Sequence, residues 1–321
     1  MAILVFAESD SGIYKKSSFE AVSYGKDLAD KLGTNCIAVS IGQKGSENLG
    51  NFGADKEVNI EGDVFNHFNA QAYAKALNEV ASSNNVDIIV ISQTYAGKAV
   101  APILAIKQDA ALATGVVDMV DTSNGFSVKK TCFSSKAIAH VSLNHSKKVI
   151  TLIPNSYKIN TSDNSVSGES IATSVASADI NTTIIETNKV TGKVVLTEAE
   201  LVVSAGRGLK GPENWNLVED LADALGAATA CSKPVSDMEW RPHSEHVGQT
   251  GITIKPNLYM AFGISGAIQH LAGVGSSKVI CVINTDPEAP FFKAADYGIV
   301  GDAFEVLPKL TKRVREIKGL A

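Results

Sequence analysis

The chain has 321 residues, of which 45% are hydrophobic and 20% charged, a composition typical of a globular protein in water. Because a single hydrophobic core stops growing at about 250–300 residues, this length predicts two domains. The formal net charge of −5 argues against nucleic acid or an anionic membrane surface as the main partner. The longest apolar runs fall short of the ~20 residues of a membrane helix, and the first residues lack the basic start and long apolar run of a secretion signal. We therefore expect a cytoplasmic protein without membrane insertion.

The four cysteines, Cys36, Cys132, Cys231 and Cys281, are far apart in the sequence and lie in or beside apolar runs. They form no CxxC pair and no cluster with histidine, so the sequence predicts reduced thiols and no metal site.

The first half of the sequence alternates apolar runs with segments of helical spacing, the pattern of an α/β domain. A helix over residues 19–32 is expected to end at Gly33, a residue suited to the left-handed conformation that follows many helices. Further helices are predicted over residues 66–83 and 99–113, with Pro102 in the first turn of the latter. The predicted strands are residues 3–7, 36–41, 58–60 and 86–92.

From Val116 the pattern changes to extended segments at residues 126–130, 131–138 and 149–153, which we interpret as a small β-rich section that closes the first domain. Residues 155–188 are rich in Ser, Thr, Asn and Asp. We interpret them as a linker with an edge strand around residues 182–186.

The second half returns to a clear α/β pattern, with predicted strands at residues 200–204, 227–231, 258–263, 279–283 and 297–300 and helices at 213–225, 267–272 and from 303. A long loop is expected between residues 231 and 251. Small or polar residues follow every strand: Gly206-Arg207-Gly208, Ser232-Lys233, Ser265-Gly266, Asn284-Thr285-Asp286 and Gly301-Asp302. Parallel α/β sheets bind ligands at the carboxyl ends of their strands, so this repetition predicts a binding site there.

Residues 206–211 satisfy the GxGxxG pattern of dinucleotide-binding folds. Two details count against a standard NAD site: Pro212 follows the third glycine, and Ser232-Lys233 stands where an acidic residue would hold the ribose hydroxyls. A glycine-rich turn that brings Arg207 to a phosphate or a flavin is the favoured interpretation.

Residues 263–271 run from a strand through a Ser-Gly turn into a helix, an arrangement that directs backbone N–H groups at an anion. Gln249, Thr250, Gln269 and His270 add hydrogen-bonding groups that suit a nucleotide cofactor with a polar ring. Each residue also has a purely structural alternative. His270 could face the core, Thr250 could stabilise a turn, Lys233 could be solvated, and Asn284 with Asp286 could form an Asx turn.

Several ordered motifs resemble the FAD-binding domain of electron transfer flavoprotein α subunits. They are Gly206-Arg207-Gly208-Leu209-Lys210, Val247-Gly248-Gln249-Thr250-Gly251, Gly263-Ile264-Ser265-Gly266-Ala267-Ile268-Gln269-His270, Asp286-Pro287-Glu288-Ala289-Pro290 and Ala295-Asp296-Tyr297-Gly298. The match covers about residues 195–310, and the start of the chain matches more loosely. The resemblance implies two domains: residues 1–190 as a nucleotide-hydrolase-like α/β domain that contacts the partner, and residues 191–321 as a doubly wound parallel-sheet FAD-binding domain.

By matching position, the resemblance implies that FAD is contacted by Arg207, Ser232, Lys233, Val247, Gly248, Gln249, Thr250, Ser265, Gly266, Ala267, Ile268, Gln269, His270, Asn284, Asp302 and Ala303. Thr250 and His270 would lie near the flavin ring, residues 265–267 near the pyrophosphate, and Asn284 and Asp302 near the adenosine. Lys233 departs from the arginine usual in the family, His246 from a glutamine, and Ala303 from a larger apolar residue.

The resemblance also implies a heterodimer with an electron transfer flavoprotein β subunit, and no substrate conversion by this chain. Electrons would pass from acyl-CoA dehydrogenases of fatty acid β-oxidation, or similar donors, to a membrane quinone oxidoreductase. The alternatives are a subunit of an electron-bifurcating flavoprotein complex, an NAD-linked dehydrogenase, and a nucleotide-sensing module without redox chemistry. The choice between a simple carrier and an electron-bifurcating complex depends on whether the β subunit carries AMP or a second flavin, and that site belongs to the other chain.

Overall fold

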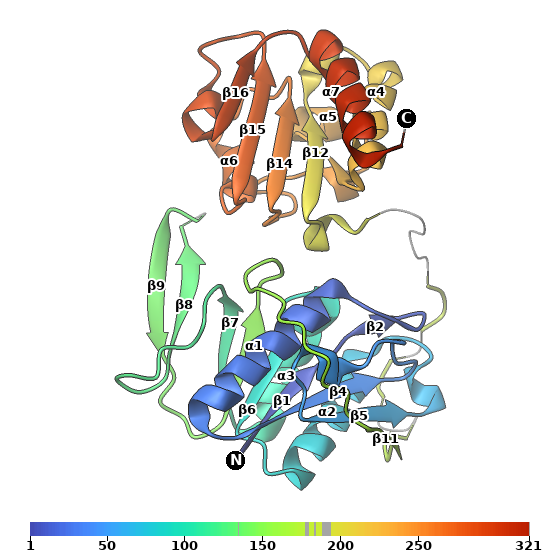
Figure 1. The fold of residues 1–321 in the computed structure, drawn as a ribbon, viewed down its shortest axis with the longest axis vertical. Helices are drawn as coiled ribbons and strands as arrows, with labels where there is room; N and C mark the ends of the chain where they lie inside the picture. The colour runs from blue at the N-terminus through green and yellow to red at the C-terminus, as the bar shows by residue number, and fades with distance from the viewer. Residues whose placement is uncertain (134, 177–179, 183, 188–193, 321) are drawn as a thin grey trace. The chain divides into compact units, whose positions relative to one another are not determined.

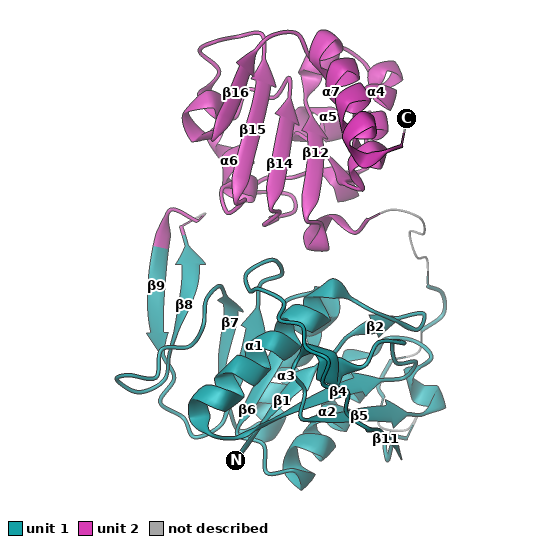
Figure 2. Cartoon of the chain, viewed as in Figure 1, with its two compact units in different colours: residues 1–132, 138–188 teal, residues 133–137, 189–321 magenta. Residues whose placement is uncertain are grey.

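The computed structural model describes residues 1–133, 135–176, 180–182, 184–187 and 194–320. The chain divides into two compact units (Figure 1). Residues 1–132 and 138–188 form unit 1, and residues 133–137 and 189–321 form unit 2 (Figure 2). The predicted boundary between residues 190 and 191 lies outside the described residues. Among the helices that are described, none combines the length and the apolar character needed to cross a membrane.

Unit 1 is built on one mixed sheet, which in the described part of the chain has the strand order β11-β5-β4-β1-β6-β10-β7-β8-β9. Neighbouring strands from β11 to β7 pair in parallel, and β8 pairs antiparallel to β7. The strands are β1 (Ala2–Phe6), β4 (Asn35–Ile41), β5 (Lys56–Glu61), β6 (Ile88–Ser92), β7 (Ala111–Val116), β8 (Ser127–Cys132), β9 (Ala137–Ser142), β10 (Lys148–Leu152) and β11 (Gly168–Ala172). The helices are α1 (Lys16–Leu32), α2 (Ala70–Ser83) and α3 (Tyr95–Gln108), and a small hairpin joins β2 (Ser9–Asp10) to β3 (Ile13–Tyr14).

The continuous apolar run of β1 reflects burial on both faces of this sheet. Leu4 and Phe6 pack in the core on the side of α2 and α3, whereas Ile3 and Val5 pack on the side of α1. Such burial is typical of parallel sheets that carry helices on both faces. As predicted, α1 ends at Gly33, whose φ of 65° lies in the left-handed region.

Four expectations for unit 1 were wrong, and the first two concern helix boundaries. The predicted helix 99–113 runs from Tyr95 to Gln108, with Pro102 in its interior, because Thr94 caps its start and Asp109 ends it at a φ of 48°. The helix expected from residue 66 begins at Ala70, where the Asn69 side chain accepts hydrogen bonds from two backbone N–H groups. The start at Asn69 reflects the preference of asparagine for the N-cap position.

The segment expected to close the domain is part of the main sheet, because β10 lies between β6 and β7 and is buried like β1. The edge strand expected around residues 182–186 is absent from the described residues of that range. The edge strand is instead β11, which pairs with β5.

Unit 2 contains, among the described residues, a five-stranded parallel sheet of order β13-β12-β14-β15-β16. Its strands are β12 (Leu201–Ala205), β13 (Ala228–Cys231), β14 (Leu258–Phe262), β15 (Val279–Asn284) and β16 (Tyr297–Val300). Its helices are α4 (Asn216–Leu225), α5 (Lys233–Asp237), α6 (Ile268–Val274) and α7 (Ala303–Lys318). This order is that of a doubly wound sheet, so the predicted two-domain α/β fold is confirmed.

The sheet of unit 2 separates two apolar layers. Val203 and Ala205 pack with residues of α4 and α7 on one face. Val202, Tyr259 and Ala261 pack on the other face, with Val274 of α6 and Phe291. The short helix α5, which lies in the predicted long loop, was not expected.

The packing of α3 on β6 generates the first prediction. A Cβ atom on Gly97 would lie 1.9 Å from the carbonyl oxygen of Ser92. We expect Gly97→Ala to lower the free energy of unfolding by about 1–3 kcal/mol, because the steric conflict outweighs the ~1 kcal/mol that alanine adds to helix stability. Urea denaturation measures this change. Lys98→Ala, which changes an exposed side chain of the same helix, is the control, and equal midpoints for both variants would contradict the prediction.

Candidate functional site

The connections of the sheet in unit 2 place its ligand crevice at the carboxyl ends of β12 and β14. From β12 the chain crosses to β13 on one side and then returns past β12 to β14 on the other. In open α/β sheets, ligands bind where the strand order reverses in this way. The loops that begin at Gly206 and Gly263 therefore form the centre of the candidate site.

These two loops are in direct backbone contact. The Gly206 N–H donates to the Phe262 carbonyl at 2.9 Å, and the Gly208 N–H donates to the Gly263 carbonyl at 3.2 Å. A Cβ atom on Gly208 would lie 2.6 Å from Gly263 Cα, and one on Gly206 would lie 2.4 Å from the Gly263 oxygen. Gly263 also has a φ of +60°, a conformation that side chains rarely adopt. The glycines are required because two backbones meet here.

The GxGxxG segment does not form a standard dinucleotide turn. Residues Arg207–Leu209 make a 3-10 turn, Lys210 has a φ of 65°, and α4 begins only at Asn216. Several residues therefore separate the glycines from the start of α4. In an NAD fingerprint, the glycine-rich turn leads directly into the helix. The Arg207 side chain is exposed and forms no ion pair or hydrogen bond with the described residues. This geometry supports the predicted role of the turn in presenting Arg207, and it argues against the NAD-linked alternative.

The segment after β13 returns along the outer edge of that strand. The Ser232 N–H donates to the Ala205 carbonyl, and the Val247 N–H donates to the Cys231 carbonyl at 3.1 Å. The Gln249 N–H then donates to the Gln269 carbonyl at 2.7 Å, which joins residues 247–250 to α6. The structure thus brings the Val247–Thr250 segment and the Ser265–His270 segment together, as the sequence predicted.

An ionic cluster that sequence analysis missed anchors the start of this segment. Arg241 donates to both carboxylate oxygens of Glu245, at 2.8 and 2.7 Å, and forms an ion pair with Glu219 of α4 at 3.0 Å. Its guanidinium also lies 5.4 Å from the centre of the Trp215 ring. A paired, bidentate arginine in a half-buried position holds a loop firmly. The four-residue spacing of Arg241 and Glu245 was the available signal.

The turn before α6 presents a row of unused backbone donors. Among the described residues, no hydrogen bond uses the N–H groups of residues 265–269. The Phe291 N–H donates to the Ser265 carbonyl and so holds the turn. Gly266 has a φ of +80° and lies directly against Phe291. The side chains of Ser265, Ala267, Ile268 and Gln269 are exposed. Consecutive free N–H groups form an anion-binding concavity.

His270 lies beneath this turn in a buried position. It is 7% exposed, its Nε2 atom is 2.8 Å from the Tyr259 hydroxyl, and its Nδ1 atom has no hydrogen-bond partner in the described structure. Burial lowers the pKa of His270 to about 4, with a further lowering by His246 and a smaller opposing effect of the Val247 carbonyl. The imidazole is therefore neutral at pH 7. His270 is therefore buried in the core, which was the structural alternative for this residue. It also lies close to residues 247–250.

His246, the residue that departs from the family pattern, is also buried. It is 2% exposed, and its Nδ1 atom lacks a hydrogen-bond partner among the described residues. Burial lowers the pKa of His246, and the nearby Lys233 and His243 lower it further. Lys233 is exposed and begins α5, so its ammonium group adds positive charge next to the 246–250 segment.

The last three predicted contacts have structural roles. Asn284 donates to the Ile264 carbonyl at 3.0 Å and accepts from the Asp286 N–H at 3.0 Å, which is the Asx-turn alternative. Asp302 caps α7 by accepting from the Phe304 N–H at 3.0 Å. Ala303 is buried at the start of α7. Asn284 lies beside the loop that follows β14, whereas Asp302 and Ala303 follow the edge strand β16.

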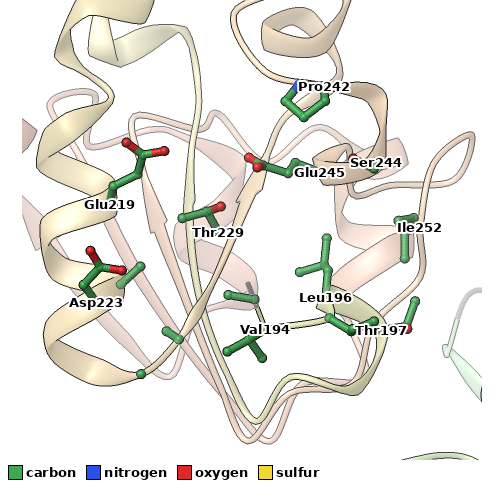
Figure 3. Close-up of a pocket in the computed structure, with 15 residues that line it drawn as sticks. Val194, Leu196, Thr197, Glu219, Asp223, Thr229, Pro242, Ser244, Glu245 and Ile252 are labelled. Carbon is green, nitrogen blue, oxygen red and sulfur yellow. The ribbon is translucent and has the colours of Figure 1, made fainter. Parts of the chain in front are cut away.

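A separate hollow of about 770 Å³ lies on the β13 side of unit 2 (Figure 3). Glu219 and Asp223 of α4 flank it on one side, and Pro242, Ser244, Glu245 and Ile252 of the long loop flank it on the other. None of the predicted cofactor contacts lines this hollow. Within the described residues, no cluster of three or more His, Cys, Asp or Glu side chains is placed to hold a metal ion.

A doubly wound sheet with free N–H groups and polar side chains at its carboxyl edge defines an α/β protein that binds a nucleotide cofactor. The family model for the electron transfer flavoprotein FAD-binding domain matches residues 195–275, and the model for the electron transfer flavoprotein domain matches residues 3–178. The chain belongs to the electron transfer flavoprotein α-subunit family, and its C-terminal part is an FAD-binding domain.

Three relatives illustrate the similarity over the full length. The chain is 35% identical to the electron transfer flavoprotein subunit alpha of Bacillus subtilis, over 98% of each chain. It is 38% identical to that of Syntrophomonas wolfei, over 97% of this chain and 98% of the relative. It is 33% identical to Protein FixB of Clostridium saccharobutylicum, over 98% of this chain and 96% of the relative.

The glycine contact generates a prediction for cofactor binding. Gly208→Ala places a methyl group against Gly263, so we expect the two loops to separate and the affinity for FAD to fall by at least tenfold. Gly301→Ala is the matched control, because a Cβ atom there would make only ordinary contacts of 3.6 and 3.8 Å. Fluorescence titration with FAD measures both affinities. Equal affinities in the two variants would contradict the role given to the contact.

The buried histidine makes stability depend on pH. The pKa of His270 is about 4 in the folded chain and ~6.5 in an unfolded one, so the unfolded chain takes up the proton first as the pH falls. The contribution of neutral His270 is complete above pH 6.5 and is lost between pH 6.5 and 4. We expect the difference in free energy of unfolding between the cofactor-free chain and its His270→Gln variant to shrink by up to about 3 kcal/mol from pH 7 to pH 4. Urea denaturation at several pH values measures it, and a constant difference would contradict the assignment.

Proposed function

We propose that this chain is the α subunit of a heterodimeric electron transfer flavoprotein that binds FAD through unit 2 and converts no substrate of its own. It accepts electrons from acyl-CoA dehydrogenases or similar donors and passes them to a membrane quinone oxidoreductase. The family membership supports an FAD-dependent electron-transfer role, and the donors, the acceptor and the β subunit are part of the proposal.

The observation that carries the proposal is the row of unused N–H groups at residues 265–269, next to the exposed side chains of Gln249 and Thr250. A doubly charged pyrophosphate is the part of FAD that such a row binds best. The buried, unpartnered Nδ1 atoms of His246 and His270 also fit a cofactor with a polar ring, because buried polar atoms otherwise find partners.

When bound, FAD supplies the capacity to hold one or two electrons, and the chain supplies binding and electrostatics. Arg207 and Lys233 place exposed positive charge beside the site, where it favours an anionic cofactor. Thr250 and His270 would face the ring, with Val247, Gly248, Ser232 and Ile268 around it. Asn284, Asp302 and Ala303 would lie toward the adenosine end, with their backbone already fixed by the hydrogen bonds described above.

Exposed apolar surface on unit 2 supports the proposal of a partner subunit. All four residues of the edge strand β16 are exposed, including Tyr297 at 67% and Val300 at 60%. Ile268, in the predicted site, is 59% exposed. Apolar side chains grouped on a strand edge are typical of surfaces that another chain covers.

Purification of the chain with its β subunit tests the proposal. We expect a yellow complex that releases FAD on denaturation. It should oxidise a reduced acyl-CoA dehydrogenase and reduce a quinone analogue, and without the dehydrogenase it should leave acyl-CoA unchanged. A colourless complex, or one that binds NAD in place of FAD, would contradict it.

Lys233 provides a sharper test of the electrostatic role. Because its positive charge lies beside the 246–250 segment, we expect Lys233→Ala to lower the reduction potential of bound FAD. Each ~1.4 kcal/mol of lost electrostatic stabilisation lowers the equilibrium constant for flavin reduction about tenfold. Lys233→Arg should keep or raise the potential, since arginine retains the charge and can stack on a ring. Lys278→Ala, an exposed lysine before β15, is the control. Equal potentials in all four proteins would show that Lys233 is only solvated.

A further inference from the structure

A buried tyrosine lies directly behind the site histidine. Tyr259 is in the middle sheet strand β14, and its side chain is completely buried. Its hydroxyl oxygen is 2.8 Å from His270 Nε2, and the rings of Tyr259 and His270 both pack near Phe291, with centres 6.3 and 5.7 Å from that of Phe291. Neither ring can turn away without disturbing this packed layer.

The direction of the hydrogen bond follows from the surroundings of the tyrosine. Burial strongly raises the pKa of Tyr259, so its hydroxyl keeps its proton. The nearby Ser204 hydroxyl opposes this rise in pKa, and its oxygen makes no hydrogen bond in the described structure. The tyrosine proton then has one acceptor within the described structure, the Nε2 atom of His270. A buried O–H group without an acceptor would be costly, so Tyr259 donates and Nε2 accepts.

The acceptor role of Nε2 determines the state of the other ring nitrogen. A neutral imidazole carries one proton, and when Nε2 accepts a hydrogen bond that proton is on Nδ1. Nδ1 is buried and has no hydrogen-bond partner in the described part of the chain. The ring lies next to the Val247–Gly248 segment, since the Val247 carbonyl acts on the imidazole and raises its pKa. His270 therefore carries its Nδ1–H group in a buried position beside the Val247–Gly248 segment of the proposed flavin site.

We infer that Tyr259 is a positioning residue, which holds His270 in the Nδ1–H form beside the Val247–Gly248 segment of the proposed flavin site. The inference rests on the proposed function for the identity of the ligand. A donor held in place before reduction stabilises negative charge on a reduced ring without any rearrangement at that moment. Tyr259 contributes through His270 and does not itself contact the cofactor.

Tyr259→Phe tests this inference, because it removes the hydroxyl and keeps the ring that packs against Phe291. Selective ¹⁵N labelling of the six histidines, with His270→Gln to assign the signal, reports which ring nitrogen carries the proton in the full-length chain. We expect the Nδ1–H form in the unaltered chain and a mixture of both forms in Tyr259→Phe. In the complex with the β subunit and FAD, the equilibrium constant for flavin reduction should fall by about tenfold.

Tyr95→Phe is the matched control, since Tyr95 is exposed on α3 of unit 1 and should change neither the tautomer nor the potential. The inference is overturned if His270 carries its proton on Nε2 in the unaltered chain, a measurement that does not depend on the folding of any Tyr259 variant. It is also overturned if Tyr259→Phe and Tyr95→Phe give the same tautomer and the same potential. Failure of the proposed function would differ from both outcomes, because the unaltered complex would then lack FAD.

Discussion

The close contact between Gly206, Gly208 and Gly263 is the constraint on which the candidate site depends. Two loops leave adjacent parallel strands at the same edge of the sheet, and their backbones touch where side chains would normally separate them. This contact lets Arg207 extend from one loop while residues 265–269 turn from the other with their N–H groups unused. A methyl group at this point would therefore alter the position of the binding groups as well as the packing.

The apolar layer beneath the site controls its electrostatics. Tyr259, Phe291 and the α6 side of the sheet surround His270, and the lack of water there keeps the imidazole neutral. A neutral ring can act as a directed hydrogen-bond donor, whereas its charge would be too costly in the absence of a nearby anion. The positive charge of the site is instead placed at exposed positions, on Arg207 and Lys233, where water stabilises it.

The long loop between β13 and β14 separates two features of unit 2. One side of the loop contributes to the hollow beside α4 (Figure 3). The other side carries Val247–Thr250 to α6. Arg241 fixes the loop by pairing with Glu219 and Glu245. The ion pairs are half-buried, so they hold the loop better than exposed pairs would. None of the predicted cofactor contacts lines the hollow.

The sequence by itself determined the α/β class, the strands of unit 2 to within one or two residues, and the edge of the sheet at which binding groups gather. These are local properties, because burial on both faces produces continuous apolar runs and strand ends produce glycine and polar residues. It could not determine the place of β10 inside the main sheet or the pairing of β11 with β5, since strand order depends on contacts between distant segments. The start of α3 was missed because a single threonine cap decided it. Within the site, only the tertiary structure decided that Asn284 and Asp302 hold their own backbone, and that Tyr259 and Arg241 support His270 and the loop. The contacts of Tyr259 with His270, of Asn284 with Ile264 and of Arg241 with Glu219 join separate elements, so no spacing along one element records them.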